Sequence, residues 1–259
     1  EELAADGVVE VMLLGHNVNS YGKNLPEPTN FSWLLRKAEE IEGIRRIRFM
    51  TSHPKDLSEE LIQVMKESKK ICRHLHLPLQ SGSTRILEKM NRRYTKEQYL
   101  ELAERIRSEI PGISLTTDII VGFPGETEED FEDTMDVVRK VRYDNAYTFI
   151  YSRRTGTPAA SMDNQVAKEE VQARFFRLIP EVQRIAREQA AGLEGTVQEV
   201  LAEEINEHIP GCLTGRMSNN LLVHFPGDPS RIGKLFPVRM EESRGFYYMR
   251  KAVSQDDCG

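Results

Sequence analysis

The sequence predicts an α/β domain built on parallel strands, followed by a small all-β barrel. Three observations support this prediction. Up to about residue 152, short apolar runs alternate with segments that carry apolar residues at helical spacing. Residues 168–195 then show one long helical pattern, and the rest of the chain has short strand-like runs separated by Gly, Pro and Asn. We therefore expect two domains, residues 1–195 and residues 196–259.

The first domain is expected to contain parallel strands separated by helices. The strands are expected at residues 9–15, 45–51, 74–80, 114–123 and 146–152, and the helices between them at 31–42, 57–68, 95–110 and 127–141. Three of these helices have start signals, because Ser58 or Asp56, Thr95 and Thr127 precede polar or acidic first turns. In the third strand, leucines alternate with polar residues, which predicts two different faces. Pro180 predicts a kink in the long helix.

Composition limits the class of protein. The chain has 259 residues, of which 39% are hydrophobic and 29% charged, and it lacks both a membrane-length apolar run and a signal-peptide pattern, so a cytoplasmic protein is expected. The net charge of −6 gives no bulk electrostatic reason for RNA binding, which would have to come from local features. The opening residues, EELAADGV, have the pattern of a helix end, a glycine cap and a strand, which indicates part of a longer protein.

Functional groups in parallel α/β folds collect where the strands end. The expected strands lead into the segments LLGHNVNSYG, MTSHPKD, PLQSGS, DIIVGFPGET and FIYSRRTGTPAA. Each is rich in small and hydrogen-bonding residues, more than a structural turn requires, and together they favour a ligand site.

Single features of these segments also have structural explanations. GFPGET could be only a tight turn before a helix, or a place where a ligand approaches the backbone. Arg92 and Arg93 could hold a carboxylate in a bidentate fork, or be solvated. Tyr147, Phe149 and Tyr151 alternate along the last strand, and their rings could stack a base. The arginine pair Arg153 and Arg154 follows them directly.

The histidines and cysteines give no recognised metal or nucleophile motif. His53, His74 and His76 could form a zinc site, but no H-E-x-x-H or C-x-x-C occurs, so histidines lining a barrel interior are favoured. No G-x-S-x-G elbow is present. The cysteines at 72, 212 and 258 are too widely spaced for a disulfide framework.

Six motifs together are similar to the methylthiotransferase family of radical S-adenosylmethionine enzymes: LLGHNVNSYG, RFMTSHPKD, HLHLPLQSGS, EKMNRRYT, TDIIVGFPGETEEDF and YSRRTGTPAA. NVNSYG resembles the tRNA-modifying MiaB branch, although His16 stands where that branch usually has Gln. The resemblance implies an incomplete radical SAM (β/α)6 partial TIM-like barrel, whose first strand and cluster loop would precede Glu1. It also implies a small OB-like TRAM barrel, which holds RNA, over residues 196–259.

The resemblance implies an activity for the parent enzyme. That enzyme would add a methylthio group to C2 of N6-isopentenyladenosine next to the tRNA anticodon, using S-adenosylmethionine and two 4Fe-4S clusters. Its partners would be the tRNA anticodon stem-loop, an electron donor such as flavodoxin or ferredoxin, and a sulfur source. The cysteines of this chain match none of the cluster ligands, so the chain by itself is expected to hold no cluster and to be inactive. Three alternatives remain. The first is another branch of the family, which acts on threonylcarbamoyladenosine in tRNA or on a ribosomal protein. The others are a metal-independent lyase or aldolase and a non-catalytic RNA-binding module.

The resemblance also implies roles for residues of this chain. Cofactor contacts are expected at Gly15, His16, Asn17, Gln80, Ser81, Arg92, Asp118, Gly122 and Tyr151. RNA contacts are expected at Asn19, Tyr21, Arg153, Arg154, Arg216, Asn219, Asn220 and Lys234. Of these, Asn17, Gln80, Arg92 and Asp118 are expected to converge on one cavity, because separated loops supply hydrogen-bonding groups that the fold does not need.

Overall fold

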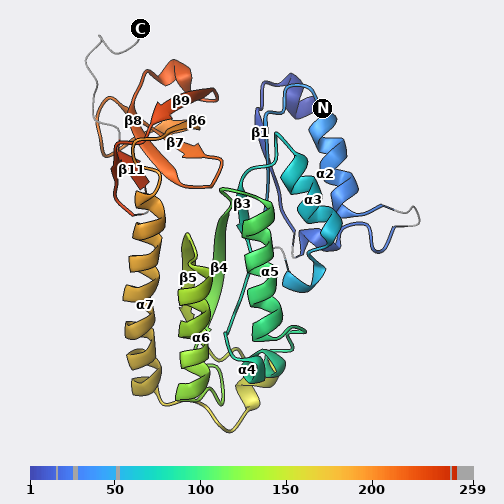
Figure 1. Cartoon of the computed structure of the whole chain (residues 1–259), viewed down its shortest axis with the longest axis vertical. Coiled ribbons are helices and arrows are strands. Elements are labelled where there is room, and N and C mark those ends of the chain that lie inside the picture. The colour runs from blue at the N-terminus through green and yellow to red at the C-terminus, as the bar shows by residue number, and fades with distance from the viewer. Residues whose placement is uncertain (16, 26–28, 51–52, 246, 250–259) are drawn as a thin grey trace.

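A computed structural model of the chain describes residues 1–249 except 16, 26–28, 51–52 and 246. A half-barrel of parallel strands and helices is joined through the long helix α7 to a smaller barrel at one end (Figure 1). Each unit has its own cluster of buried apolar side chains. The predicted fold class is confirmed.

The strands of the half-barrel are parallel and follow one another in chain order. They are β1 (Glu10–Leu13), β2 (Arg46–Phe49), β3 (His74–His76), β4 (Ser114–Val121) and β5 (Asn145–Ile150). β1 pairs with β2, and β3, β4 and β5 form a second sheet. A parallel bridge between Ile47 and Ile71 connects the two. This order is expected when each crossover passes through a helix and returns to the neighbouring strand.

The helices begin where the sequence signals predict. The helices of the half-barrel are α1 (Glu2–Ala5), α2 (Phe31–Glu40), α3 (Glu59–Glu67), α4 (Thr84–Lys89), α5 (Lys96–Glu109) and α6 (Glu128–Val141), and α7 (Lys168–Ala191) follows them. Ser58, Thr95 and Thr127 cap α3, α5 and α6 through their side chains, the last two in complete capping boxes. The helix α4 was not predicted, since one and a half turns are too short for a periodic pattern. α7 continues through Pro180.

The third strand ends at His76, earlier than the alternation of leucines predicts. The chain still runs beside β4, but side chains replace much of the regular ladder. The hydroxyl groups of Tyr94 and Tyr99 donate to the carbonyl groups of residues 77–79. Gln80 then adopts a left-handed backbone with φ of 68°. These long-range contacts override the strand pattern in the local sequence.

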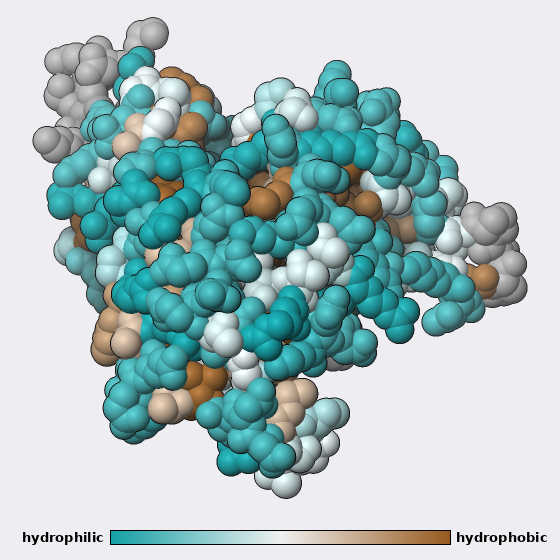
Figure 2. Space-filling model, turned by 60° about the horizontal axis from the view of Figure 1, so that its bottom comes forward, coloured by the Kyte–Doolittle hydropathy of each residue, from teal (hydrophilic) through white to brown (hydrophobic). Residues whose placement is uncertain are grey.

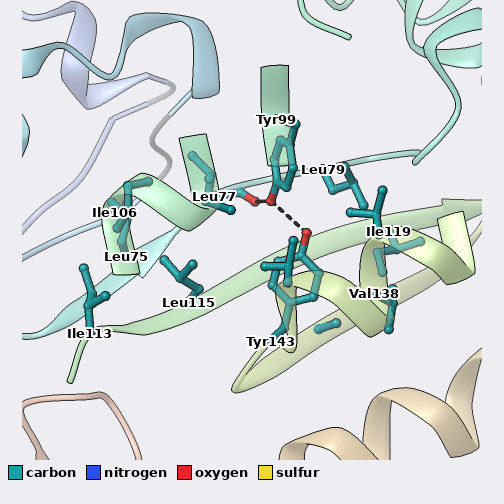
Figure 3. Close-up of a cluster of buried hydrophobic side chains, with 14 of the residues drawn as sticks. Leu75, Leu77, Leu79, Tyr99, Ile106, Ile113, Leu115, Ile119, Val138 and Tyr143 are labelled. Carbon is teal, nitrogen blue, oxygen red and sulfur yellow. Dashed lines mark hydrogen bonds between the residues drawn. The ribbon is translucent and has the colours of Figure 1, made fainter. Parts of the chain in front are cut away.

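The core of the half-barrel is packed between its sheets and its helices. Figure 3 shows leucines from the β3 segment beside apolar side chains of β4, α5 and α6. The labelled residues are Leu75, Leu77, Leu79, Ile106, Ile113, Leu115, Ile119 and Val138, with Tyr99 and Tyr143. The hydroxyl of Tyr143 donates to that of Tyr99 at 3.0 Å. Burial raises the pKa of both phenols, so the pair stays neutral within the core.

The smaller barrel is a single mostly antiparallel sheet. Its strands are β6 (Val197–Ile205), β7 (Cys212–Met217), β8 (Leu222–Pro226), β9 (Leu235–Arg239), β10 (Glu242–Ser243) and β11 (Tyr247–Met249), in the order β10-β11-β8-β7-β6-β9. The pair of β11 with β8 is parallel. Val200, Val223, Phe225 and Tyr248 are buried at its centre.

Two buried arginines of β2 attach the small barrel to the half-barrel. Arg46 donates to the carbonyl of Glu199 at 2.6 Å and to that of residue 216 at 2.8 Å. Arg48 donates to the carbonyls of residues 217 and 218 at 2.7 and 3.1 Å, and its Nε donates to the Glu10 carboxylate at 2.8 Å. We call this set, namely Glu10, Arg46, Arg48 and the main chain of residues 216–218, the junction. Both arginine side chains are almost fully buried.

Removing one arginine of the junction should strongly destabilise the protein. In Arg48→Ala, the Glu10 carboxylate, only 13% exposed, loses its closest partner, so the free energy of unfolding should fall by about 3–5 kcal/mol. The control Arg36→Ala removes an ion pair with Glu67 in which both side chains are about half exposed. The free energy of unfolding of this variant should change by less than about 1 kcal/mol. Urea unfolding measures both variants, and equal losses would contradict the role of the junction.

Candidate functional site

Two adjoining cavities open where β4 and β5 end. The larger has a volume of about 570 Å³ and the smaller about 410 Å³. Their shared lining consists of Gln80, Ile120, Tyr151, Thr157 and Ala159. Figure 2 shows the end of the molecule to which the strands lead; its surface is mostly hydrophilic, with apolar side chains in separate patches.

The two cavities differ in chemistry. The larger, here the β5 cavity, is also lined by Asp118, Phe149, Ile150, Ser152 and Arg154. The smaller, here the Arg92 cavity, is also lined by Lys89, Met90, Asn91, Arg92, Phe123 and Pro158. Both cavities have a phenylalanine ring, but the β5 cavity has a carboxylate and one basic side chain, whereas the Arg92 cavity has two basic side chains and no carboxylate.

Gln80 is held at the shared wall by the neighbouring strand. Its N–H donates to the carbonyl of Asp118 at 2.8 Å, and its carbonyl accepts from the N–H of Ile120 at 2.9 Å. These two bonds fix a left-handed backbone that a non-glycine residue adopts only at a cost. The local sequence does not require this conformation. Because the strained residue Gln80 also lines both cavities, it is a candidate functional residue.

The turn after β4 is supported from behind by α7. Gly122 has φ of 79°, and its N–H donates to the Glu126 carboxylate at 2.9 Å. A Cβ at Gly122 would lie 2.5 Å from Val171, so only glycine fits. Burial raises the pKa of Glu126, while the fully buried Arg174, which donates to Glu126 at 3.1 Å, opposes this rise. Gly122 and Tyr151 both line a further small cavity of about 220 Å³.

Tyr151 lines all three of these cavities. Its hydroxyl is buried and has no hydrogen-bond partner among the described residues. Its ring packs edge-on against Phe123 with centroids 5.4 Å apart. A buried hydroxyl without a partner costs about 1–3 kcal/mol, which a polar ligand group would recover. The site therefore fits a ligand with polar groups, as a nucleoside cofactor has.

The four residues expected to converge on one cavity do not all line the same one. Gln80 lines both cavities, Asp118 the β5 cavity and Arg92 the Arg92 cavity. Asn17 lines neither, because its amide donates to the Asp56 carboxylate at 2.6 Å. Its Oδ1 atom is buried without a partner among the described residues. Asn17 thus braces the loop after β1 against the loop after β2.

Other expected residues near these loops have structural contacts. The amide of Asn19 donates to the carbonyl of His53 at 3.3 Å and accepts from its N–H at 3.2 Å. Ser81 is fully buried, and its hydroxyl accepts from the main-chain N–H two residues on. Of the rest, Gly15 and Tyr21 are exposed, and His16 lies outside the described residues.

The residues expected to contact RNA lie in three places, of which the loop after β1 has been described above. After β5, Arg154 lines the β5 cavity, and Arg153 donates to the carbonyl of Ala160 at 2.7 Å. In the small barrel, Arg216, Asn219 and Asn220 lie in or beside the turn between β7 and β8, and Lys234 directly precedes β9.

In the small barrel, most of the expected RNA contacts also bond within the chain. Arg216 Nε donates to the Glu203 carboxylate at 2.8 Å, and a second nitrogen donates to the Asn220 carbonyl at 3.3 Å. Asn219 Oδ1 accepts from the main-chain N–H two residues on. Lys234 is exposed.

The residues expected to contact cofactor or RNA did not include Phe149 or residues 157–159, which line the cavities. The sequence did contain a signal for both. Phe149 alternates with Tyr147 and Tyr151 among the aromatic side chains that could stack a base, and residues 157–159 lie in the segment FIYSRRTGTPAA.

His74 and His76 are buried on β3 in the half-barrel. His74 Nε2 and His76 Nδ1 each lie 3.0 Å from the hydroxyl of Thr116, and His76 Nε2 lies 3.4 Å from Asp118 Oδ2. Among the described residues, no group of three or more His, Cys, Asp or Glu side chains can hold a metal ion. The predicted barrel-lining role therefore agrees with the structure better than a zinc site does.

The described cysteines do not fit a site for an iron–sulfur cluster. Cys72 is buried beside the start of β3, and Cys212 is half-buried at the start of β7 in the other unit. Burial raises the pKa of the Cys72 thiol, which disfavours the thiolate that iron needs. Cys258 lies outside the described residues.

The chain thus combines a parallel half-barrel that has cavities at its strand ends with a small β-barrel. Residues 1–138 match the model of the Radical SAM superfamily, and residues 192–248 match that of the TRAM domain. The chain belongs to the radical SAM superfamily, and the resemblance stated from the sequence is confirmed.

Similar proteins carry the name tRNA-2-methylthio-N(6)-dimethylallyladenosine synthase. The one from Lachnoclostridium phytofermentans is 60% identical over 249 residues, which cover 96% of this chain and 55% of that protein. The one from Clostridioides difficile is 52% identical over 247 residues, covering 95% and 52%. The chain thus spans about half the length of the curated relatives it matches.

A solved structure, coproporphyrinogen III oxidase from Escherichia coli, aligns with a TM-score of 0.49 and 15% identity, over 72% of this chain and 50% of that one. Among the described residues, no helix has the length and apolar character needed to cross a membrane.

The buried His74 should make stability depend on pH. Burial, aided by the charge of Arg48, lowers the pKa of His74 to about 3, whereas the unfolded side chain titrates near 6.5. The unfolded state therefore binds more protons below pH 6.5, and the stability falls as the pH drops. From pH 7 to pH 5 this residue should account for about 2 kcal/mol of lost stability.

Urea unfolding of His74→Gln at pH 7 and pH 5 tests this assignment. The variant should lose about 2 kcal/mol less than the wild type over this interval. The control His208→Gln, on the exposed surface of the small barrel, should behave as the wild type does. An unchanged pH dependence in His74→Gln would show that another group causes the acid sensitivity.

Proposed function

We propose that this chain is part of a tRNA methylthiotransferase, which adds a methylthio group to C2 of N6-isopentenyladenosine next to the anticodon. The observation that carries the proposal is the 60% identity, over 96% of the chain, to a protein named tRNA-2-methylthio-N(6)-dimethylallyladenosine synthase. The cavities at the strand ends support it, because nucleoside cofactors of parallel α/β enzymes bind at that edge.

In this proposal S-adenosylmethionine binds in the Arg92 cavity. Arg92 and Lys89 suit its carboxylate, and Gln80 and Tyr151 offer hydrogen bonds. When bound, the cofactor supplies hydrogen abstraction and the methyl group. The protein's own contribution is to orient the cofactor and the RNA substrate where the two cavities share a wall, and to exclude water from that place.

The remaining parts of the activity belong to the whole protein. The described cysteines do not form a cluster site. An electron donor such as flavodoxin or ferredoxin, a sulfur source and a cytoplasmic location are further parts of the proposal.

We assign the RNA-positioning role to the small barrel, with a domain boundary between residues 195 and 196. The match to the TRAM domain and the exposed side chains of Arg231, Lys234 and Arg239 support this role. Arg216, paired with Glu203, has less of its charge available to phosphate. Lys234 is therefore the better test residue.

The chain should bind an anticodon stem-loop carrying N6-dimethylallyladenosine, and Lys234→Gln should weaken that binding. The slope of log K against log salt concentration should fall by about 0.7–0.9, since one phosphate contact is lost. Fluorescence anisotropy between about 50 and 200 mM salt measures it. Lys37→Gln, on α2 of the half-barrel, is the control and should leave the slope unchanged. A chain with no measurable affinity for the hairpin would contradict the proposed function.

A further inference from the structure

Four side chains of β3 and β4 form a continuous hydrogen-bonded network. Asp118 Oδ2 lies 3.4 Å from His76 Nε2, and His76 Nδ1 lies 3.0 Å from the Thr116 hydroxyl. The same hydroxyl lies 3.0 Å from His74 Nε2. The two strands pair side by side (Figure 1), and residues two apart on a strand share a face, which brings the four side chains together. We call Asp118, His76, Thr116 and His74 the Thr116 network.

The two ends of the Thr116 network lie in different surroundings. Asp118 is the only carboxylate among the residues that line the β5 cavity, and its side chain is 30% exposed. His74 is buried, and the charges of Arg48 and Arg216 act on it. Arg48 belongs to the junction. The network therefore leads from a cavity at the strand ends to a buried histidine near the junction.

The donors and acceptors of the Thr116 network can follow only one order while Asp118 is ionised and both rings are neutral. A carboxylate only accepts, so His76 donates to it from Nε2 and its Nδ1 accepts from the Thr116 hydroxyl. That hydroxyl has a single hydrogen, so its oxygen accepts from His74 Nε2. His74 is neutral, because burial, aided by the charge of Arg48, lowers its pKa to about 3.

We infer that His76 is a positioning residue for Asp118, and that Thr116 and His74 hold its ring in the tautomer that donates to the carboxylate. Asp118 Oδ2 is then occupied, and Oδ1, which has no partner among the described residues, is the acceptor left for the β5 cavity. A ligand group that bonds to it must donate a hydrogen. The inference goes beyond the proposed function, which uses neither histidine.

Nitrogen-15 NMR of the complete chain tests the order of donors without any ligand. The chemical shift of a ring nitrogen shows whether that nitrogen carries a hydrogen. Spectra are recorded at about pH 8, where an ordinary imidazole is neutral. The signals are assigned by their loss in His74→Gln and His76→Gln. In the wild type, both rings should carry their hydrogen on Nε2.

Two variants of Asp118 distinguish the acceptor from the bulk of the side chain. Asp118→Leu removes the acceptor, so both rings should show signals averaged between their two tautomers. Asp118→Asn keeps an oxygen that can accept from His76 and should retain the wild-type tautomers. The control is Asp56→Asn, because the Asp56 charge acts on His53. It should change the signals of His53 and leave those of His74 and His76 unchanged.

Thr116→Val interrupts the network, because it removes the hydroxyl that joins the two rings. When Asp118→Leu is added to this variant, the signals of His76 should still change, whereas those of His74 should not. Asp118 is not among the charges that act on His74, so a direct electrostatic route is absent. Thermal unfolding checks that each variant is folded. If Thr116→Val does not fold, the comparison of Asp118→Leu with Asp118→Asn decides by itself.

Three results would overturn the inference. The first is a hydrogen on Nδ1 of either ring in the wild type, and the second is a pair of rings that Asp118→Leu leaves unchanged. The third is a response of His74 to Asp118→Leu that persists in Thr116→Val. Because no RNA or cofactor takes part, these results leave the proposed function as it stands, and a failure of hairpin binding leaves this inference as it stands.

Discussion

The geometry of the whole chain depends on how two buried arginines of β2 are satisfied. Arg46 and Arg48 lie on the inner face of the half-barrel, where an uncompensated charge would cost several kcal/mol. Glu10 neutralises part of this charge, and main-chain carbonyls of the small barrel accept most of the remaining hydrogen bonds. The hydroxyl of Ser218 in the β7–β8 turn adds a side-chain contact, since it accepts from the N–H of Arg73 at 2.8 Å.

The turn between β7 and β8 shows that the same polar residues can indicate either RNA binding or a structural role. Arg216, Asn219 and Asn220 look like RNA contacts, yet in the structure they shape the β7–β8 turn that enters the junction. A polar residue in a recognisable pattern can thus be needed for folding, for binding or for both. Lys234, by contrast, is exposed.

Features set by neighbours in sequence were predictable, and features set by distant contacts were not. The helix starts at Ser58, Thr95 and Thr127 follow from local capping chemistry, and the strand order follows from the alternation of elements. The left-handed Gln80 and the diversion of Asn17 to Asp56 depend on partners 38 or more residues away. The site could accordingly be located at the strand ends, but its division into two cavities needed coordinates.

The unbroken helix α7 limits how this chain can change during evolution. Its side chains enter both cores, with Leu178 and Ile185 in the first and Ala190 in the second. Inserting one residue into an α-helix turns everything beyond it by about 100° and moves it by about 1.5 Å. Such an insertion would rotate the small barrel away from Arg46 and Arg48. The length of α7 should therefore be inherited without insertions or deletions even where its surface residues vary freely.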